Sequence, residues 1–415
     1  MTSLEPVRLP DPPWMGEAGT RRVMAALAAG GTAVRFVGGC VRDALLGRPV
    51  VDIDIATPDP PERAMRKLED AGLRALPTGI DHGTVSALAD GRRYEVTTLR
   101  RDVETDGRRA RVAFTDDWRA DAARRDFTFN AMSADPDGRV YDYFGGLADL
   151  RAGCVRFVGD PRARIDEDHL RLLRFWRFHA HYGRAAPRAA ERAACRAAAP
   201  LLDRLSGERI REELLKLLAA PDPVPSVAAM AEDGVFAVLP FSTVAVGALA
   251  ALIALEPVYD RDPLRRLAAL MPADPQARTA DAVAARLRLS RAQRARLLAT
   301  AAATPLESRA ALRAALHRAG QAAILDRVLL AAARAGVGPA AVADDLAEIA
   351  AWSAPRFPLT GADLLAAGVA PGPRLGRLLT TVEDWWVGRD FAPDRDACLA
   401  QAQLLMATSP AAAGS

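Results

Sequence analysis

One stretch, VRFVGGCVRDALLGRPVVDIDIAT at residues 34–57, constrains the fold of this chain more than any other. Its apolar start predicts a short strand that ends at Gly38 and Gly39, and Cys40 begins a helical pattern. Glycines leave backbone N–H groups accessible, and the positive end of the helix dipole faces the same point. The sequence therefore predicts a polyphosphate-binding turn between the strand and the helix.

Two carboxylates follow this turn. Asp52 and Asp54 stand two apart in an apolar segment with strand character, so period-two geometry sends both carboxylates to one face. Carboxylate oxygens are hard ligands that suit Mg²⁺, and Mg²⁺ beside a phosphate supports two-metal chemistry. Taken separately, a glycine turn and an aspartate pair also fit an ordinary turn and a strand with one solvated face. Together in one short segment, they favour a metal-dependent phosphate site.

This combination resembles the signature of the nucleotidyltransferase superfamily, in which a glycine turn precedes a metal-binding aspartate pair. The longer form resembles the bacterial and eukaryotic class of tRNA CCA-adding enzymes and the related bacterial poly(A) polymerases. The likeness is close over about residues 30–220 and sparse afterwards. Further segments match that class in order: DGRR (106–109, its mobile loop), DAARRDFTFNA (121–131), DYFGGLADL (142–150, its glycine hinge), RIDEDHLRLLRFWRF (164–178, its base-reading helix), SGERIREELLKLL (206–218) and LTGADLLAAGVAPGPRLG (359–376).

The resemblance implies a template-independent enzyme that adds CMP and AMP, from CTP and ATP, to the 3′ end of tRNA with Mg²⁺ as cofactor. Asp52 and Asp54 would be the catalytic residues and metal ligands. Rival activities within the family are A addition alone, CC addition alone and poly(A) synthesis, and a rival from another class is a non-catalytic RNA-binding protein. The nucleotide-binding residues implied are Gly39, Arg42, Arg125, Asp168, Arg171, Arg174 and Arg177.

The segment from Asp166 onwards predicts a helix that could select a base. Asp168 and Arg171 are three apart and would share one helix face. Cytosine and adenine both present an exocyclic amine beside a ring-nitrogen acceptor, so Asp168 could accept from the amine while Arg171 donates to the ring nitrogen. The alternative is a salt-bridged surface helix, in which each pair stabilises by only about 0.2–0.5 kcal/mol.

Neighbouring residues have secondary roles in this interpretation. Glu95 either supplies a third carboxylate or pairs with Arg93 or Arg100 on a wet face. Most charged side chains of segment 206–218, Glu213 among them, are expected to lie on a solvated helix face. Further expectations are that Asp43 orients Arg42 or its helix, that Asp126 and Asn130 lie near ribose or phosphate, that Phe127 and Phe129 belong to the core, and that His169 and His179 are structural.

A chain of 415 residues is too long for one ordinary core, so several units are expected. Strand patterns are concentrated early, and from about Asp160 the chain has long Ala/Leu/Arg helical periodicity. We predict an α/β, palm-like catalytic head with a mixed sheet (1–150), a helical base-selecting neck (151–220), and a helical body and tail (221–415) that bind tRNA. A basic cluster in the body could grip an RNA backbone: Arg286, Arg288, Arg291, Arg294 and Arg296.

The net charge of +3 hides a local excess of basic residues. Residues 151–220 contain 15 basic and 9 acidic side chains, enough to meet phosphates although the whole chain is nearly neutral. The start of the chain lacks an apolar signal-peptide core, and the four cysteines form no CxxC pair, which favours a cytoplasmic location. Residues 234–255 are uncharged, but Pro240 and Gly247 interrupt them, so we expect two buried helices and no membrane span. No protein partner is inferred.

Overall fold

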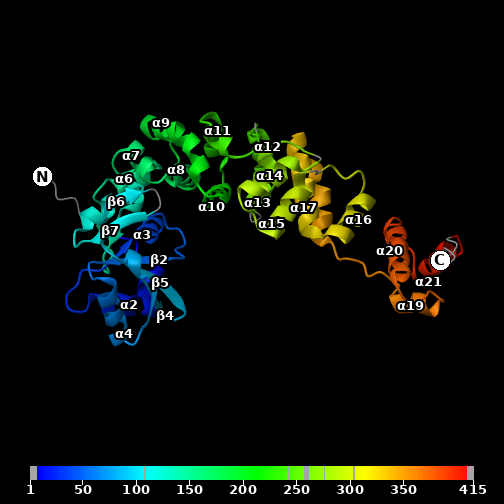
Figure 1. Ribbon diagram of the computed structural model, residues 1–415, viewed down its shortest axis with the longest axis horizontal. Coiled ribbons are helices and arrows are strands. Elements are labelled where there is room, and N and C mark those ends of the chain that lie inside the picture. The colour runs from blue at the N-terminus through cyan, green and yellow to red at the C-terminus, as the bar shows by residue number, and fades with distance from the viewer. Residues whose placement is uncertain are drawn as a thin grey trace. The chain divides into compact units, whose positions relative to one another are not determined.

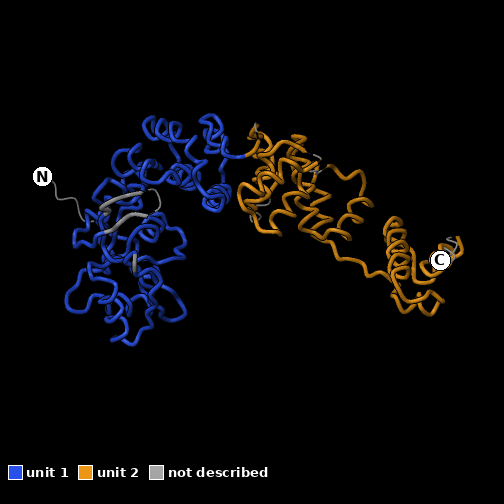
Figure 2. Tube along the Cα trace, in the orientation of Figure 1, with its two compact units in different colours: residues 1–239 blue, residues 240–415 orange. Residues whose placement is uncertain are grey.

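The computed structural model describes residues 7–106, 109–241, 243–256, 261–274, 276–301 and 304–408, apart from the side chains at positions 81 and 102–112. The chain forms two compact units, Met1–Leu239 and Pro240–Ser415 (Figure 2). The predicted boundaries at 150 and 220 both fall inside the first unit, so the three-part division stays a prediction. Gly107 and Arg108, in the predicted mobile loop, lie outside the described residues.

A mixed seven-stranded sheet forms the N-terminal part of the first unit (Figure 1). In order across the sheet, its strands are β3 (Arg74–Gly79), β4 (Thr84–Ala89), β5 (Arg92–Thr98), β2 (Ile53–Thr57), β1 (Arg35–Val37), β8 (Ser133–Ala134) and β9 (Val140–Tyr141). Strand β2 pairs in parallel with β5 and antiparallel with β1, and all the other pairs are antiparallel. The mixed sheet expected for the head is therefore present, with β2 at its centre.

Side chains along the central strands alternate between the two faces of the sheet, and the face with the apolar side chains is the one that the helices cover. Ile53, Ile55 and Tyr94 are buried on one face. Helices α2 (Ala18–Ala28) and α4 (Pro61–Asp70) cover that face, and the hydroxyls of Thr20 in α2 and Tyr94 lie 3.1 Å apart. The opposite face carries Asp54. Strands β6 (Arg100–Asp106) and β7 (Arg109–Phe114) form a separate two-stranded sheet.

The rest of the first unit is mostly helical. Its main helices are α5 (Trp118–Ala123), α6 (Gly146–Ala152), α7 (Pro161–Glu167), α8 (Leu170–Tyr182), α9 (Ala189–Ala198), α10 (Gly207–Leu218) and α11 (Val224–Glu232). An aromatic core joins this part to the segment after α5. Phe127 and Phe129 are buried in it as predicted, and the Phe127 ring centroid lies 4.7 Å from that of Phe157 and 5.1 Å from that of Phe178.

Two histidines have the structural roles that were expected. His179 is buried, and its Nδ1 lies 2.7 Å from the Ser226 hydroxyl. His169 has its Nδ1 3.1 Å from the carbonyl oxygen of Ile165. Both rings therefore connect α8 to neighbouring backbone or side chains.

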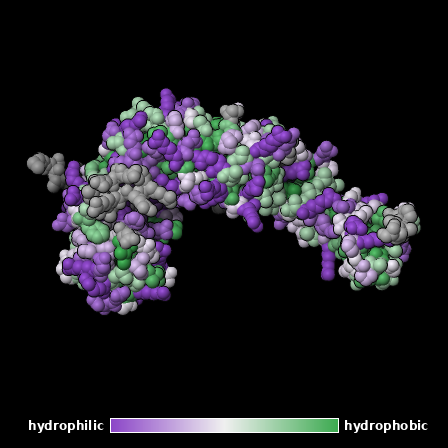
Figure 3. Space-filling model, in the orientation of Figure 1, coloured by the Kyte–Doolittle hydropathy of each residue, from purple (hydrophilic) through white to green (hydrophobic). Residues whose placement is uncertain are grey.

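The second unit consists of helices over its described residues. They are α12 (Val246–Leu255), α13 (Pro263–Leu270), α14 (Arg278–Arg286), α15 (Arg291–Ala301), α16 (Arg309–Ala319), α17 (Gln321–Ala335), α18 (Ala343–Ala351), α19 (Gly361–Ala366), α20 (Pro373–Val387) and α21 (Arg395–Thr408), with a 3₁₀ turn at Pro339–Val342. No helix in the described ranges is both long and apolar enough to cross a membrane. Figure 3 shows hydrophilic and hydrophobic residues intermixed over the visible face of the molecule.

Buried ion pairs in the second unit change the expectation for the basic cluster. Arg296 donates to Asp326 at 2.5 and 2.8 Å and to Asp262 at 2.7 Å. Asp326 is 1% exposed and also accepts from Arg265 at 2.7 Å. The charge of Arg296 therefore compensates a buried carboxylate, and the proposal that the cluster grips RNA stays a prediction. Arg294 pairs with Asp281 on the surface.

The predicted glycine hinge is a close packing contact. Gly145 has φ +77° and precedes α6, whose first residue is Gly146. A Cβ on Gly146 would lie 2.2 Å from the carbonyl oxygen of Thr128 and 2.9 Å from the Cα of Phe129. Asp142 holds the same turn by accepting the Gly146 N–H at 2.9 Å. Only glycine lets α6 approach the 3₁₀ turn Thr128–Asn130 this closely.

We predict that Gly146→Ala destabilises the first unit by about 3 kcal/mol or more, because the added methyl meets rigid backbone rather than a movable side chain. Thermal unfolding followed by circular dichroism would measure the change. The matched control is Gly376→Ala in α20, where nothing lies within 4 Å of the new Cβ. That control is expected to stabilise by about 0.5–1 kcal/mol. An unchanged melting temperature for Gly146→Ala would contradict the packing argument.

Candidate functional site

The glycine turn connects β1 to helix α3 (Gly39–Leu45). Gly38 has φ +72° and ψ −123°, a conformation that residues with a Cβ rarely adopt. A Cβ on Gly38 would also lie 2.9 Å from Nη1 of Arg125. The backbone conformation therefore requires glycine at position 38, and the absence of a Cβ also leaves room for the Arg125 guanidinium. The turn and the predicted nucleotide contacts Gly39 and Arg125 thus come together in space.

The candidate carboxylates lie beside this turn. Asp54 is opposite Glu95 in the parallel register of β2 and β5, so both side chains share one sheet face. Continuing the register of β1 and β2 by one pair places Val37, the residue before the turn, opposite Asp54. Asp52 is exposed and precedes β2, which starts at Ile53.

The electrostatics of Asp54 show an accumulation of negative charge. The pKa of Asp54 is raised from 3.8 to about 6. Burial is the largest cause of this shift, and repulsion from Glu95 is the next. The nearby Arg125 opposes this shift, and Asp52 contributes further repulsion. A divalent cation would relieve the repulsion, and oxygen ligands suit Mg²⁺, so the residues fit such an ion. No three His, Cys, Asp or Glu side chains among the described residues form a complete metal cage, so phosphate and water would supply other ligands.

Arg42, one helical turn into α3, is held from several sides. It donates to both carboxylate oxygens of Asp43, from Nε at 2.9 Å and from Nη2 at 2.7 Å. Its Nη1 donates to Oδ1 of Asn130 at 2.6 Å. The Tyr182 hydroxyl donates to Asp43 at 2.9 Å, and the Tyr182 ring lies 4.3 Å from the Arg42 guanidinium carbon. Asp43 therefore orients Arg42, as expected.

The same contacts continue from Asn130 into the neck. Asn130 donates from Nδ2 to Asp126 at 3.1 Å, and Asp126 accepts from Arg174 at 2.7 Å. Glu213, which is only 5% exposed, lies 3.6 Å from Arg174 and accepts from Arg177 at 2.6 Å. Burial favours protonation of Asp126, but Arg174 and the Asn130 amide outweigh it and lower the pKa of Asp126. We call the set Tyr182, Asp43, Arg42, Asn130, Asp126, Arg174, Glu213 and Arg177 the polar chain.

Asp168 lies at a break between two helices. Helix α7 ends at Glu167, Asp168 has φ −155° and ψ 108°, and α8 begins at Leu170. The prediction of one continuous helix through Asp168 is therefore wrong. The Asp168 carboxylate accepts the Leu170 N–H at 3.1 Å, which satisfies a free donor at the start of α8. It also accepts from Arg209 at 2.7 Å, which fixes its orientation.

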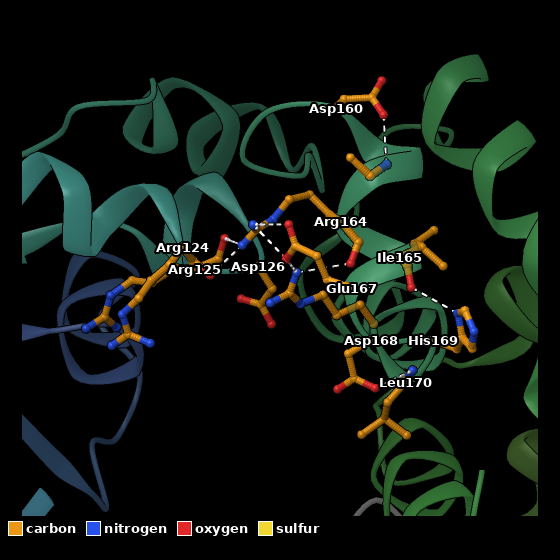
Figure 4. Close-up of polar contacts among 12 residues, drawn as sticks. Arg124, Arg125, Asp126, Asp160, Arg164, Ile165, Glu167, Asp168, His169 and Leu170 are labelled. Atoms are coloured by element: carbon orange, nitrogen blue, oxygen red, sulfur yellow. Dashed lines mark hydrogen bonds and ion pairs between the residues drawn. The ribbon is translucent and has the colours of Figure 1, made fainter. Parts of the chain in front are cut away.

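Glu167 organises the arginines around this break (Figure 4). It accepts from Arg164 at 2.8 Å and from Arg171. Arg164 is 9% exposed and also donates to the backbone carbonyls of Arg124 and Arg125, at 2.9 Å for Arg125. The neck is thus tied to the segment that carries Arg125. No side-chain hydrogen bond or ion pair within the described residues joins Asp168 or Arg171 to Asp52 or Asp54.

Sequence reasoning missed two members of the polar chain. Glu213 was expected on a solvated face, and that prediction is wrong. Ile210, Leu214 and Leu217 of α10 are buried, and Glu213 falls in the same stripe at i, i+3, i+4 and i+7. That spacing could have revealed it. Tyr182 had no such signal, because its contact with Asp43 spans 139 residues of sequence.

We predict that Asp54→Asn stabilises the metal-free protein by about 1–2 kcal/mol above pH 6, because it removes a carboxylate whose pKa is raised. The folded state favours the protonated acid, so the stability that this acid contributes is present below about pH 4 and is lost as pH rises through about 6. The gain from Asn should grow over this range and then level off.

Urea unfolding at several pH values, with and without Mg²⁺, would measure this gain. Mg²⁺ should stabilise the wild type more than Asp54→Asn, since a ligand stabilises the state that binds it. The exposed Asp137→Asn is the matched control and should change neither quantity. A variant no more stable than the wild type at pH 8 without metal would argue against repulsion at this site.

Family models and a solved structure match this chain over both the sheet that carries the candidate site and the helices that follow it. A family model for the poly A polymerase head domain matches residues 34–156. A model described as the probable RNA and SrmB-binding site of polymerase A matches residues 190–245. The solved structure of the Bacillus stearothermophilus CCA-adding enzyme in complex with CTP superposes with a TM-score of 0.73 at 26% identity, covering 93% of this chain and 96% of that one.

Curated relatives extend the likeness over most of the chain. The Danio rerio protein named CCA tRNA nucleotidyltransferase 1, mitochondrial, is 47% identical over 190 residues, which are 45% of this chain and 44% of the relative. The Mus musculus protein of the same name is 32% identical over 389 residues, which are 88% of this chain and 85% of the relative. The α/β head with its helical continuation and this identity over most of both sequences show that the chain belongs to the family of CCA-adding tRNA nucleotidyltransferases.

Proposed function

We propose that this enzyme adds CMP and AMP, from CTP and ATP, to the 3′ end of tRNA without a nucleic-acid template. The observation that carries the proposal is the convergence of the Gly38–Gly39 turn, Arg125 and the Asp54 carboxylate at one end of β1 and β2. The printed names of similar proteins support the substrate assignment. One solved relative is a CCA-adding enzyme in complex with CTP, and the mouse relative is a CCA tRNA nucleotidyltransferase.

In this proposal the head binds and orients the triphosphate. The N–H groups at the start of α3 and the guanidinium groups of Arg42 and Arg125 would bind phosphate oxygens. Asp52 and Asp54 would hold Mg²⁺, while Glu95, opposite Asp54, adds negative charge beside the ion. When bound, Mg²⁺ supplies charge neutralisation for the phosphates and activation of the attacking 3′-hydroxyl.

The neck would select the base in this proposal. Asp168 accepts from Arg209 and Arg171 donates to Glu167, so both groups are oriented before a nucleotide arrives. Asp168 retains acceptor capacity for an exocyclic amine, and Arg171 retains N–H donors for a ring nitrogen. Arg174 and Arg177 would then hold the triphosphate or the primer end while Glu213 fixes their direction.

The compartment belongs to the same proposal. Cys40, Cys154, Cys195 and Cys398 are all free thiols, which suits a reducing compartment. We therefore propose the cytoplasm.

One experiment separates this function from its rivals within the family. Radiolabelled tRNA lacking CCA is incubated with CTP, with ATP, or with both, and the products are sized on a denaturing gel. We expect two additions with CTP alone and three with both nucleotides. No addition with CTP alone would exclude CCA addition, and a long ladder with ATP alone would indicate a poly(A) polymerase.

A pair of variants tests the catalytic carboxylates. We predict that Asp52→Ala and Asp54→Ala each lower the rate of CTP incorporation at least about 1,000-fold, because several kcal/mol of transition-state charge stabilisation would be lost. Single-turnover kinetics with saturating tRNA would measure the rate. Affinity for tRNA should stay within about threefold of the wild type. The exposed Asp137→Ala is the control, and equal activity of all variants would favour the non-catalytic alternative.

A further inference from the structure

A partly buried arginine at the start of β1 lies between two aromatic rings. The guanidinium carbon of Arg35 is 3.5 Å from the Tyr141 ring centroid and 4.2 Å from the Trp118 ring centroid. Its Nη1 donates to the Tyr143 hydroxyl at 3.1 Å. Both rings therefore contact the guanidinium, which has further N–H donors besides the one that Tyr143 accepts.

Among the residues that the structure describes, Arg35 lacks the carboxylate partner that the candidate nucleotide-binding arginines and Arg164 have. Arg42, Arg125, Arg164, Arg171, Arg174 and Arg177 each form an ion pair with Asp or Glu. In the described part of the chain, Arg35 forms none, and its polar contact is with the neutral Tyr143 hydroxyl. A partly desolvated cation without a counter-ion is costly, and a bound anion would compensate it.

Two exposed arginines extend this surface. Arg139 lies 5.4 Å from the Tyr141 ring, and Arg119 lies 5.6 Å from the Phe144 ring. Neither has an ion pair within the ranges that the structure describes. Cations alternating with aromatic side chains are a pattern that binds single-stranded nucleic acid. We call Arg35, Arg119, Arg139, Trp118, Tyr141 and Phe144 the arginine–aromatic patch.

The patch lies on the sheet face that carries the candidate carboxylates. Arg35 pairs with Ala56, and the same register brings Val37 opposite Asp54, so Arg35 and Asp54 project from one face. Trp118 packs against Val37 and Ala56 on that face. Arg35 is two residues from Val37 along β1, which corresponds to about 7 Å. The patch is therefore adjacent to the carboxylates, on the side away from the glycine turn.

We propose that the arginine–aromatic patch binds the backbone phosphates of the substrate RNA's single-stranded 3′ segment, just upstream of its terminal nucleotide. This assignment rests on the proposed function. An RNA strand suits the patch better than a nucleotide does, because the three cations come from β1, from α5 and from the residue before β9 rather than from one point. The planar fork of Arg35 can bind a phosphodiester with two hydrogen bonds while the neighbouring rings accept stacking bases.

Equilibrium binding of 5′-labelled tRNA lacking CCA, followed by fluorescence anisotropy across a salt series, tests the proposal without requiring catalysis. We expect Arg35→Gln to weaken tRNA binding about 5–10-fold and to reduce the salt slope by about one, as loss of one phosphate contact should. Arg35→Lys keeps the charge but not the planar fork and should recover only part of the affinity. The dissociation constant of CTP, measured by calorimetry, should stay within twofold.

The matched control is Arg22→Gln. Arg22 is an exposed arginine of α2 paired with Asp90, and α2 covers the opposite face of the sheet. It should change neither affinity nor salt slope. If Arg35→Gln fails to fold, the double variant Arg119→Gln/Arg139→Gln tests the same surface at exposed positions.

Two results would overturn the proposal. One is tRNA binding and a salt slope unchanged in the patch variants. The other is loss of CTP affinity with tRNA affinity intact, which would make the patch a nucleotide-phosphate site. Failure of the proposed function would appear differently, as wild-type protein that binds tRNA but adds no nucleotide.

Discussion

The candidate site depends on the polar chain that runs from Tyr182 to Arg177. Its links are charge-assisted hydrogen bonds between buried groups, such as Arg42 to Asn130 at 2.6 Å and Arg177 to Glu213 at 2.6 Å. Buried charges are tolerated when every one has a partner, and removing one partner leaves another group uncompensated. The chain therefore fixes, as one unit, the arginines on α3 and α8. It connects the turn that follows β1 to the helices of the neck.

Unlike the paired groups of the polar chain, the candidate metal-binding carboxylates have little compensating positive charge. Asp126 is satisfied by Arg174 and Asn130, whereas Asp54 faces Glu95 and Asp52 with only Arg125 to offset them. The surroundings therefore stabilise the ionised form of Asp126 but disfavour that of Asp54. A site that concentrates unbalanced charge of one sign is suited to bind charge of the other sign.

Much of the head could be predicted from local sequence, because strand alternation and the glycine turn depend on neighbouring residues. The buried strands at Phe36, Ile55 and Tyr94 and the aromatic core at Phe127 follow from such patterns. The partners of the arginines could not be predicted. Arg177 and Glu213 are 36 residues apart, and the apolar spacing of α10 indicates that Glu213 is buried but not which arginine it meets. The break at Asp168 was missed because the residues on both sides favour helix, and the deciding contact is with Arg209 on another helix.

The order of the polar chain along the sequence has a consequence for synthesis. Arg42 emerges from the ribosome early, but Tyr182, Arg174 and Glu213 emerge much later. A nascent head could form its sheet and join Arg42 to Asp43 and Asn130, but Asp43 would lack Tyr182 and Asp126 would lack Arg174 until α8 has left the exit tunnel. The polar chain is therefore completed only once the neck has been translated.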